Sequence, residues 1–334
     1  MRNIYDPALL GRRTAPGARQ RGIAIVMVLL VVALTAALVA SVVWRELVAV
    51  REVENQRLNV ETMWVERAAV EWARATLAAQ SATSNVAYVG QAWSAPVDDL
   101  QLANILPREA LEVNGDLAGT YISGAVEDAQ AKFNLMDLVS RPGPSQPWQI
   151  DGGGLEAYRR LLGQLSLNPG LAPLTAAYLL RSLGDSNGGG WPLQPVSVQD
   201  LARIPGYSEQ AVQTLSAFVT VLPDYTSINA NTAAEPVLVA AIPSLSPGQA
   251  HMLVERRSSA YFVDTADLAV VLAPTLTNAE LPPGSIAGVN SGYFIVHCRV
   301  HSAKINTRVD TLIGRYGIGG FSWTAVVWVH RLAT

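Results

Sequence analysis

A run of 21 residues without a charged side chain, from Ile23 to Val43, constrains this chain more than any other feature. As an α-helix, at about 1.5 Å per residue, such a run is about as long as the hydrocarbon core of a bilayer is thick. Five arginines and one aspartate precede the run, whereas arginine and glutamate are mixed after it. Because positive charge favours the cytoplasmic side, we expect the N-terminus in the cytoplasm and the rest of the chain across the membrane.

The charge balance argues against several classes of function. The first 22 residues carry a net charge of +4 within a chain of net charge −3, so the remainder carries −7. An acidic body is poorly suited to nucleic acid, which proteins bind largely through phosphate charge. The single cysteine, Cys298, excludes an intramolecular disulfide and a cysteine-based zinc site. No motif of a serine hydrolase, zinc protease, P-loop or dinucleotide site occurs in a matching context, so we expect no catalytic residues and no enzyme activity.

The N-terminal segment has three interpretations. A cleaved signal peptide would use the small residues Thr35–Ala37 before the cut, but its apolar stretch is usually only about 7–15 residues long. An uncleaved anchor is the second interpretation. The third depends on the sequence Arg19-Gln20-Arg21-Gly22, which directly precedes the apolar run. This basic leader ending in glycine resembles the type III signal of type IV pilins and pseudopilins. In that family prepilin peptidase cuts after the glycine, here between Gly22 and Ile23, and the apolar helix is kept.

The helix is predicted to continue beyond the membrane. No proline or glycine occurs from Arg45 to Gln80, and Met63, Val70 and Leu77 recur at intervals of seven residues. Polar residues occupy the remaining positions. We therefore predict one helix over 23–80, with residues 23–44 in the membrane and the outer half packed on the chain's own folded body.

The rest of the chain predicts an α+β fold. Residues 119–128 alternate like a strand, and strands are also expected at 293–300, 304–316 and 321–331, the last two joined by a turn at Gly317–Gly320. We expect loop over 81–117, with a short helix near 97–105. Short helices are expected at 155–167, 172–183, 197–203, 208–219, 232–241, 247–257 and 264–271. Strands before and after a helical block predict a small antiparallel sheet domain, 81–140 and 285–334, with a large all-helical domain inserted at 141–284.

In this order, the segments resemble the K-type minor pseudopilins (GspK, also XcpX) of type II secretion systems. The resemblance covers almost the whole chain and is carried by RQRG–IAIVMVLLVVAL at 19–34, VEDAQAKFNLMDLV at 126–139, LARIPGYSEQAVQTL at 201–215, LPDYTSINANTAAEPVLVAAI at 222–242 and SGYFIVHCRV at 291–300. Members of that family likewise carry a helical domain inserted into a pilin-like sheet, behind a long pilin-like N-terminal helix.

This resemblance implies a non-enzymatic subunit that caps the pseudopilus tip and initiates its assembly. The implied partners are the I-type and J-type minor pseudopilins, the H-type and major pseudopilins, prepilin peptidase and the inner membrane. Secreted substrates or the outer-membrane secretin are further implied contacts, and no nucleic acid is expected. Residues 1–22 would be a leader that is removed, and the new N-terminus would be methylated. The mature chain would cross the inner membrane once, with its C-terminal domain in the periplasm.

Met27 supports a position at the tip. Most pilins and pseudopilins have glutamate as the fifth mature residue, where it meets a neighbour's N-terminal amine. Counting from Ile23, the fifth residue here is Met27, and K-type subunits characteristically lack this glutamate. Because an unpaired carboxylate in lipid is costly, its absence fits a subunit with no neighbour above it.

The same resemblance implies calcium, in an acidic loop of the helical domain. The equivalent stretch here is 183–191, in which Asp185 and Asn187 are the candidate ligands. Ca²⁺ takes about six to eight oxygen ligands, and this stretch lacks the further acids of the family loop. A calcium site and a flexible glycine-rich loop therefore both remain open. We expect no other cofactor.

Two other patterns have both a functional and a purely structural interpretation. His297 and His301 share one strand face with Arg299, which predicts a solvated face rather than a metal site, and Cys298 should point the other way and be buried. Residues 228–257 look like a helix-hairpin-helix of competence-type DNA-binding proteins, but the hairpin Pro243–Pro247 lacks glycine. Such a membrane-anchored DNA-binding protein, or a type IV pilus tip subunit, is the alternative function.

Overall fold

The computed structural model describes residues 20–109, 118–143, 145–184, 192–273, 280–317 and 319–332. Within it, the chain divides into two compact units, one ending at Glu61 and the other beginning at Thr62. The described part of the first unit is a single helical segment. All of the sheet and the remaining helices belong to the second unit.

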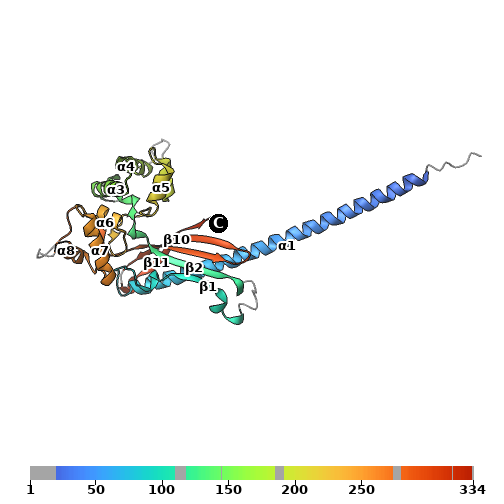
Figure 1. The fold of residues 1–334 in the computed structure, drawn as a ribbon, viewed down its shortest axis with the longest axis horizontal. Helices are drawn as coiled ribbons and strands as arrows, with labels where there is room; N and C mark the ends of the chain where they lie inside the picture. Colours follow the sequence, from blue (N-terminus) through green and yellow to red (C-terminus); the bar gives the residue numbers. More distant parts are fainter. Residues whose placement is uncertain are drawn as a thin grey trace, which may run out of the picture. The chain divides into compact units, whose positions relative to one another are not determined.

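The first helix, α1, extends over Gln20–Ser81, so it passes from the first unit into the second (Figure 1). The predicted helix over 23–80 is confirmed to within three residues at each end. The part of α1 that belongs to the first unit contains the uncharged run, where no glycine or proline after Gly22 interrupts the backbone hydrogen bonds. The part from Thr62 onward packs on the sheet of the second unit.

The sheet contains five antiparallel strands in the order β1-β2-β9-β10-β11. Their bounds are Val97–Gln101 for β1, Tyr121–Asp128 for β2, Tyr293–His301 for β9, Asn306–Tyr316 for β10 and Trp323–Leu332 for β11. Strands β2 and β9 are neighbours, with Asp128 opposite Phe294, although the helices α3–α8 separate them in the sequence. The chain therefore leaves the sheet and returns to it at the same end. The fold class predicted from the sequence, a long apolar helix with a small antiparallel sheet, is confirmed.

The two faces of this sheet have different coverings. On one face, Phe294, Val296 and Ile313 pack against Val70 and Leu77 of α1. Alternation along β9 places the odd-numbered residues on the other face, where Tyr293 packs with Leu312, Ala129 and Leu222. Cys298 belongs to the α1 side and is 2% exposed, which confirms its predicted burial.

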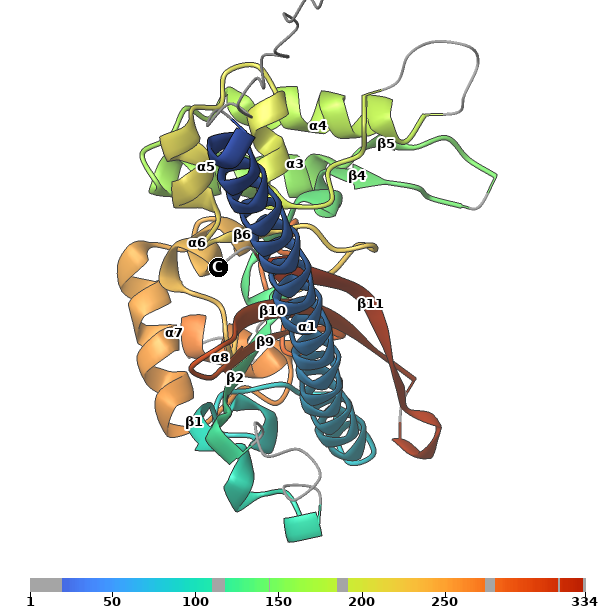
Figure 2. The same ribbon diagram turned by 90° about the vertical axis from the view of Figure 1, so that its right-hand side faces the viewer.

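Between β2 and β9, the described residues form six α-helices and several short elements. Figures 1 and 2 show where these helices lie in the second unit. The α-helices are α3 (Gly152–Gln164), α4 (Leu171–Ser182), α5 (Glu209–Leu215), α6 (Glu235–Ala241), α7 (Pro247–Ser259) and α8 (Thr265–Leu272). The two-residue strands are β3 (Phe133–Asn134), β4 (Val139–Ser140), β5 (Gln149–Ile150), β6 (Val219–Thr220), β7 (Ile228–Asn229) and β8 (Ala287–Gly288). The 3₁₀ helices of the second unit are η1 (Ala92–Ser94), η2 (Leu102–Asn104), η4 (Ala129–Ala131), η5 (Leu135–Leu138), η6 (Val198–Arg203) and η7 (Gly319–Phe321).

These helices share one apolar core with the segment that enters them. Tyr158, Leu161 and Leu179 are fully buried together with Phe133 and Leu138, which follow β2 in the sequence. Phe133 stacks on Tyr158 with 5.1 Å between the ring centroids. The entering segment is therefore built into the helical core as well as joined to the sheet.

The helix predicted near 97–105 is wrong in its first half. Val97–Gln101 form β1, which pairs with β2, and only Leu102–Asn104 form a 3₁₀ turn. Pairing with β1 provides hydrogen-bond partners for backbone groups of β2, which a helix at this place could not do. In addition, Ser123 Oγ of β2 accepts from the backbone N–H of Asp99 and donates to its carboxylate. The predicted helix over 197–203 is a 3₁₀ helix, opened by a capping box of Ser197 and Asp200. The other predicted helices and strands are present, with shifted ends.

Gly154 provides a sharp test of the helical core. A Cβ at this position would overlap the Asp137 carbonyl group, which is backbone and cannot turn aside. We expect Gly154→Ala to lower the free energy of unfolding by about 2 kcal/mol, as other overpacked sites do. Thermal melts of the full chain in detergent measure the effect.

Gly163→Ala is the matched control, because Gly163 lies in the same helix and a Cβ there meets no atom within 4 Å. It should leave stability unchanged or raise it by about 0.5–1 kcal/mol, the helix-propensity gain of alanine over glycine. Equal melting temperatures for the two variants would contradict the close approach at Gly154.

Candidate functional site

The apolar part of α1 is the largest exposed feature of the described chain. Its most apolar 18-residue window has a mean hydropathy of 3.1 and is 0% buried. By length and composition this helix can cross a membrane, and a signal sequence near an N-terminus can have the same character. An apolar surface of this extent is suited to contact with lipid or with other helices.

The structure places the predicted processing residues inside this helix. Gly22 and Ile23 lie in the first turn of α1, which begins at Gln20. Ile23 is 65% exposed and Met27 is 61% exposed. Met27 therefore presents an uncharged side chain on the exposed surface of the helix. The candidate calcium ligands Asp185 and Asn187 lie outside the described residues.

Asp128, at the last position of β2, is a buried hydrogen-bonding centre. Its Oδ1 accepts from the backbone N–H of Gln130 at 2.9 Å. Its Oδ2 accepts from Asn229 Nδ2 at 2.8 Å, Thr232 Oγ1 at 2.6 Å and Ser291 Oγ at 2.7 Å. Burial raises the pKa of Asp128 even though these donors favour the charged form. One carboxylate thus ties the sheet, the helical block and the segment that leads into β9.

Neighbouring polar side chains extend this junction. Gln130 donates to the carbonyl of Ser227 at 2.8 Å, and its side-chain oxygen accepts from the backbone N–H of Gly292. Asn229 also donates to the carbonyl of Ala87 at 2.8 Å. Arg315 of β10 donates to the carbonyl of Ser291 at 2.6 Å. Buried backbone groups of three chain segments are satisfied in this way, which fixes how the segments meet.

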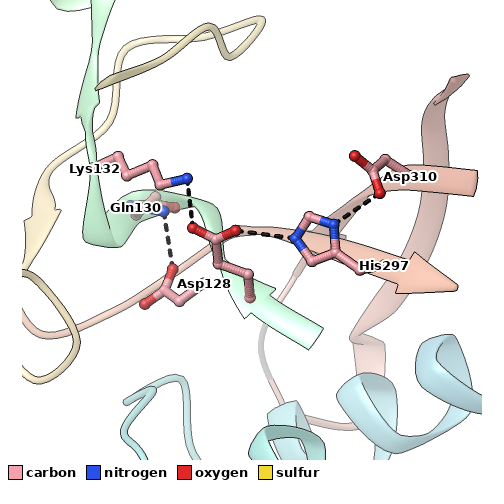
Figure 3. A network of polar contacts seen from close by, with 6 residues as sticks. Asp128, Gln130, Lys132, His297 and Asp310 are labelled. Carbon is pink, nitrogen blue, oxygen red and sulfur yellow. Dashed lines mark hydrogen bonds and ion pairs between the residues drawn. The ribbon is translucent and has the colours of Figure 1, made fainter. Parts of the chain in front are cut away.

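A second polar network crosses the sheet face opposite α1 (Figure 3). His297 Nδ1 lies 2.8 Å from Asp310 Oδ1, and His297 Nε2 lies 3.0 Å from Glu127 Oε2. Lys132 Nζ approaches Glu127 Oε1 at 2.7 Å. Both ring nitrogens of His297 therefore face carboxylates, an arrangement that only the doubly protonated imidazolium satisfies.

The charges of this network shift the pKa values of its members. Hydrogen bonds to Asp310 and then Glu127 outweigh burial and raise the pKa of His297 to about 9. Burial alone would raise the pKa of Glu127, but the hydrogen bond with His297 and the charge of Lys132 lower it to about 2. At neutral pH the network holds two cations and two carboxylates. We interpret it as a set of polar contacts that links β2, β9 and β10 and stabilises their pairing.

Alternation along β9 places the histidines of this strand on one face. His297, Arg299 and His301 lie on the face opposite Cys298, and His297 retains 40% side-chain exposure. Burial raises the pKa of Cys298 to about 12, so its thiol stays protonated. Among the described residues, no group of three or more His, Cys, Asp or Glu side chains could hold a metal ion. The acids that flank His297 were missed from the sequence, because they come from two other strands.

The arginines near the hairpin Pro243–Pro247, which the alternative function would use to bind DNA, form hydrogen bonds within the protein. Arg257 donates to the carbonyls of Ala230 and Ala233 at 2.7 and 2.6 Å, and Arg256 donates to the carbonyl of Ala260 at 2.8 Å. Ser246 of the hairpin caps α7 with a capping box that includes Gln249. Side chains of this segment therefore support its own fold.

An apolar groove of about 440 Å³ lies beside the outer part of α1. Its walls include Ala68 and Trp72 from the helix, and Leu100 and Ile105 from the β1 region. Trp72 is 53% exposed and Ile105 is 55% exposed. Surface of this kind is typical of contacts between proteins.

Comparisons with known proteins all indicate one family. Two family models, both described as type II secretion system protein K, match residues 131–224 and 228–284. A Pseudomonas aeruginosa protein named type II secretion system protein K is 27% identical and matches over 83% of each chain. A chain in the crystal structure of the GspK-GspI-GspJ complex from the enterotoxigenic Escherichia coli type 2 secretion system matches with a TM-score of 0.61. This match covers 85% of the present chain and 100% of that chain, at 18% identity, and shows a shared fold.

The network around His297 predicts a pH dependence of stability. Because folding raises the pKa of His297 from 6.5 to about 9, its contribution is complete below pH 6.5 and is lost as the pH rises through 9. After allowance for solvent screening of this half-exposed group, we expect His297→Gln to cost about 1 kcal/mol at pH 6 and little above pH 9.5. Melts of the full chain across this range measure the difference.

His251→Gln is the control for this experiment. His251 also contacts a carboxylate, Glu235, but its side chain is 63% exposed, so water screens the pair. A loss of stability for His297→Gln that stays constant from pH 6 to pH 9.5 would show that the ring acts by packing and not by its charge.

Proposed function

We propose that this chain, which is similar to type II secretion system protein K over most of its length, belongs to that family, caps the tip of the pseudopilus and initiates its assembly. In this proposal it is a minor pseudopilin and a structural, non-enzymatic component. The observation that supports it most directly is the combination of an exposed apolar helix with a K-type fold in one chain. The helix is suited to packing among other helices, and the folded unit that follows it would lie at the end of the assembly.

The proposal assigns a role to each part of the chain. Residues 1–22 are a leader that prepilin peptidase removes at the Gly22–Ile23 bond, and 23–80 are the assembly helix, with 23–44 in the inner membrane. Residues 81–140 and 285–334 form the pilin-like sheet domain, and 141–284 form the inserted helical domain. The N-terminus lies in the cytoplasm and the folded body in the periplasm, as the arginines before the apolar run favour.

The proposed partners follow from the complex in which the structural relative was solved. That chain was crystallised with GspI and GspJ, and we propose that the corresponding I-type and J-type minor pseudopilins bind this chain. The apolar groove beside Trp72 supports a contact with another subunit close to the assembly helix. Contacts with the H-type and major pseudopilins, secreted substrates or the secretin belong to the same proposal. Calcium bound through Asp185 and Asn187 is a further part of it, to be tested by the melting temperature with Ca²⁺ and with Mg²⁺.

Processing at Gly22 is directly testable. When the full chain is coexpressed with prepilin peptidase and extracted from membranes, we expect an N-terminal Ile23 that carries a methyl group. Gly22→Val should leave the leader attached, because a branched side chain replaces the glycine at the cut. N-terminal sequencing and intact mass report the outcome.

Gly11→Val is the matched control, since it changes a glycine within the leader but away from the cut. An intact Met1 in the unaltered chain, or a start near Leu38, would contradict prepilin processing. The first result would indicate an uncleaved anchor, and the second an ordinary signal peptide.

The tip position predicts how a carboxylate at Met27 behaves. Without a neighbour above it, Met27→Glu places an unpaired acid in lipid at a cost of up to about 2.5–3.5 kcal/mol, the value at the centre of a membrane helix. We expect this variant to co-elute with the I-type and J-type subunits much less than the unaltered chain after coexpression and detergent extraction. Met27→Leu, which keeps the apolar character, should co-elute normally.

Equal complex formation by Met27→Glu would contradict the tip position, because a neighbouring N-terminal amine would then be pairing with the new carboxylate. If the unaltered chain itself fails to co-elute with either subunit, the proposed partners are wrong. Size-exclusion chromatography with mass detection distinguishes these two results.

A further inference from the structure

We infer that the outer edge of β11 binds an extended segment of another protein, which adds a sixth strand to the sheet. Among the described residues, β11 pairs only with β10 and is the last strand in the sheet order. Figure 2 shows β11 at the side of the sheet, next to β10. Alternate backbone N–H and C=O groups of an outermost strand point away from its neighbour. We call this row of groups on Trp323–Leu332 the β11 edge.

The two edge strands of this sheet, β1 and β11, differ in length, regularity and charge, and only β11 has the properties of a strand that can pair with another chain. The opposite edge is β1, which has five residues, an irregular register between Val97 and Leu100, and exposed acids at Asp98 and Asp99. Short length, irregularity and charge are the devices that keep an edge from pairing with other chains. Strand β11 has ten residues and no acidic side chain. Near the start of β11, the carbonyl of Thr324 already accepts from Arg74 Nη2 of α1 at 2.7 Å. The open part of the β11 edge is therefore the part that follows Thr324.

The side chains beside the β11 edge are apolar on both faces of the sheet. Val326 and Val329 lie opposite Ile313 and Thr311, on the α1 side, and are 40% and 53% exposed. Leu332, on the other face, is 43% exposed. A strand added at this edge would cover apolar surface above and below the sheet, as well as satisfying the backbone groups.

The pairing of β11 with β10 indicates which part of β11 the added strand can occupy. The pairing of β10 with β11 shifts between Leu312 and Ile313, which leaves Val327 as an extra residue in β11. A bulge of this kind bends the strand and divides it into two runs, of which Trp328–Leu332 is the longer. We therefore place the added strand along Trp328–Leu332, where a partner segment of about five residues is sufficient.

The charges near this run define the chemistry of the partner. Arg308 of β10 is exposed and lies opposite Leu332, and His330 and Arg331 belong to the run itself. Arg331 already pairs with Glu66 at 2.8 Å but remains 56% exposed. A second copy of β11 has no carboxylate to offer these cations. The partner is therefore a different protein, with a segment in which apolar residues alternate and at least one carboxylate lies beside the arginines.

This inference does not depend on the proposed function, and a synthetic strand tests it. The probe is an acetylated, amidated peptide of about eight residues in which valine alternates with threonine, with a glutamate at each end. Hydrogen exchange of the full chain in detergent is followed with and without saturating peptide. We expect exchange of β11 amides to slow by about tenfold, while the amides of β1 are unchanged.

Two controls separate strand addition from general stickiness. The same peptide with all of its interior backbone amides N-methylated keeps the side chains but has no N–H on either edge to donate to the β11 edge, so it should give no protection. With glutamine in place of the two glutamates of the peptide, so that a new lysine has no carboxylate to attract, Val329→Lys should weaken peptide binding about tenfold, because an edge lysine opposes pairing. Val263→Lys, at a 57% exposed valine of the helical block, should bind like the unaltered chain.

Several results would overturn the inference. Absence of protection by the unmodified peptide would show that the β11 edge does not accept a strand. Equal protection by the N-methylated peptide would assign the effect to apolar contact alone. Protection of β11 without peptide that rises with protein concentration would assign the edge to a second copy of this chain. Because the unmodified and methylated peptides are compared on the unaltered chain, a folding defect in Val329→Lys leaves the test intact.

Discussion

The buried carboxylate of Asp128 is the interaction on which the arrangement of the folded unit depends. A charge removed from water is costly unless donors replace the lost hydration. Here the replacement comes from Asn229 and Thr232 of the helical block and from Ser291, which precedes β9. If the helical block were displaced, two of these donors would be lost while the carboxylate stayed buried. The junction therefore favours one orientation of the block relative to the sheet.

A comparable buried acid fixes the outer part of α1 on the sheet. Glu66 is 5% exposed, and it accepts from Thr307 Oγ1 at 3.0 Å and from Arg331 Nη2 at 2.8 Å. Those two donors come from β10 and β11, so one helix residue sets the position of two strands. The apolar contacts of Val70 and Leu77 supply the burial, and the polar contacts select the register. In contrast, the uncharged run of the same α1 is exposed within the part of the chain that the structure describes, and its apolar surface is suited to lipid and to assembly.

Several elements could be predicted from the sequence because their cause is local. The uncharged run, the absence of helix breakers and the repeat of Met63, Val70 and Leu77 are enough to predict α1. Alternation predicts β9 to β11, and caps and breakers predict most of the short helices. Strand β1 was missed because Asp98 and Asp99 do not favour a strand, and only pairing with β2 makes them one. The acids beside His297 were missed for a similar reason, since Glu127 and Asp310 reach it across two strand pairs.

The sequence by itself determined a membrane-length apolar helix, the basic segment that precedes it, an α+β body and the residues that resemble one secretion family. These are consequences of composition and short-range spacing, which the chain carries before it folds. Only the tertiary structure decided that Asp128 joins three segments, that His297 lies between two carboxylates and that β11 is the open edge of the sheet. Each of these depends on residues far apart in sequence, because strand order and register bring them together and neither is encoded in a local pattern.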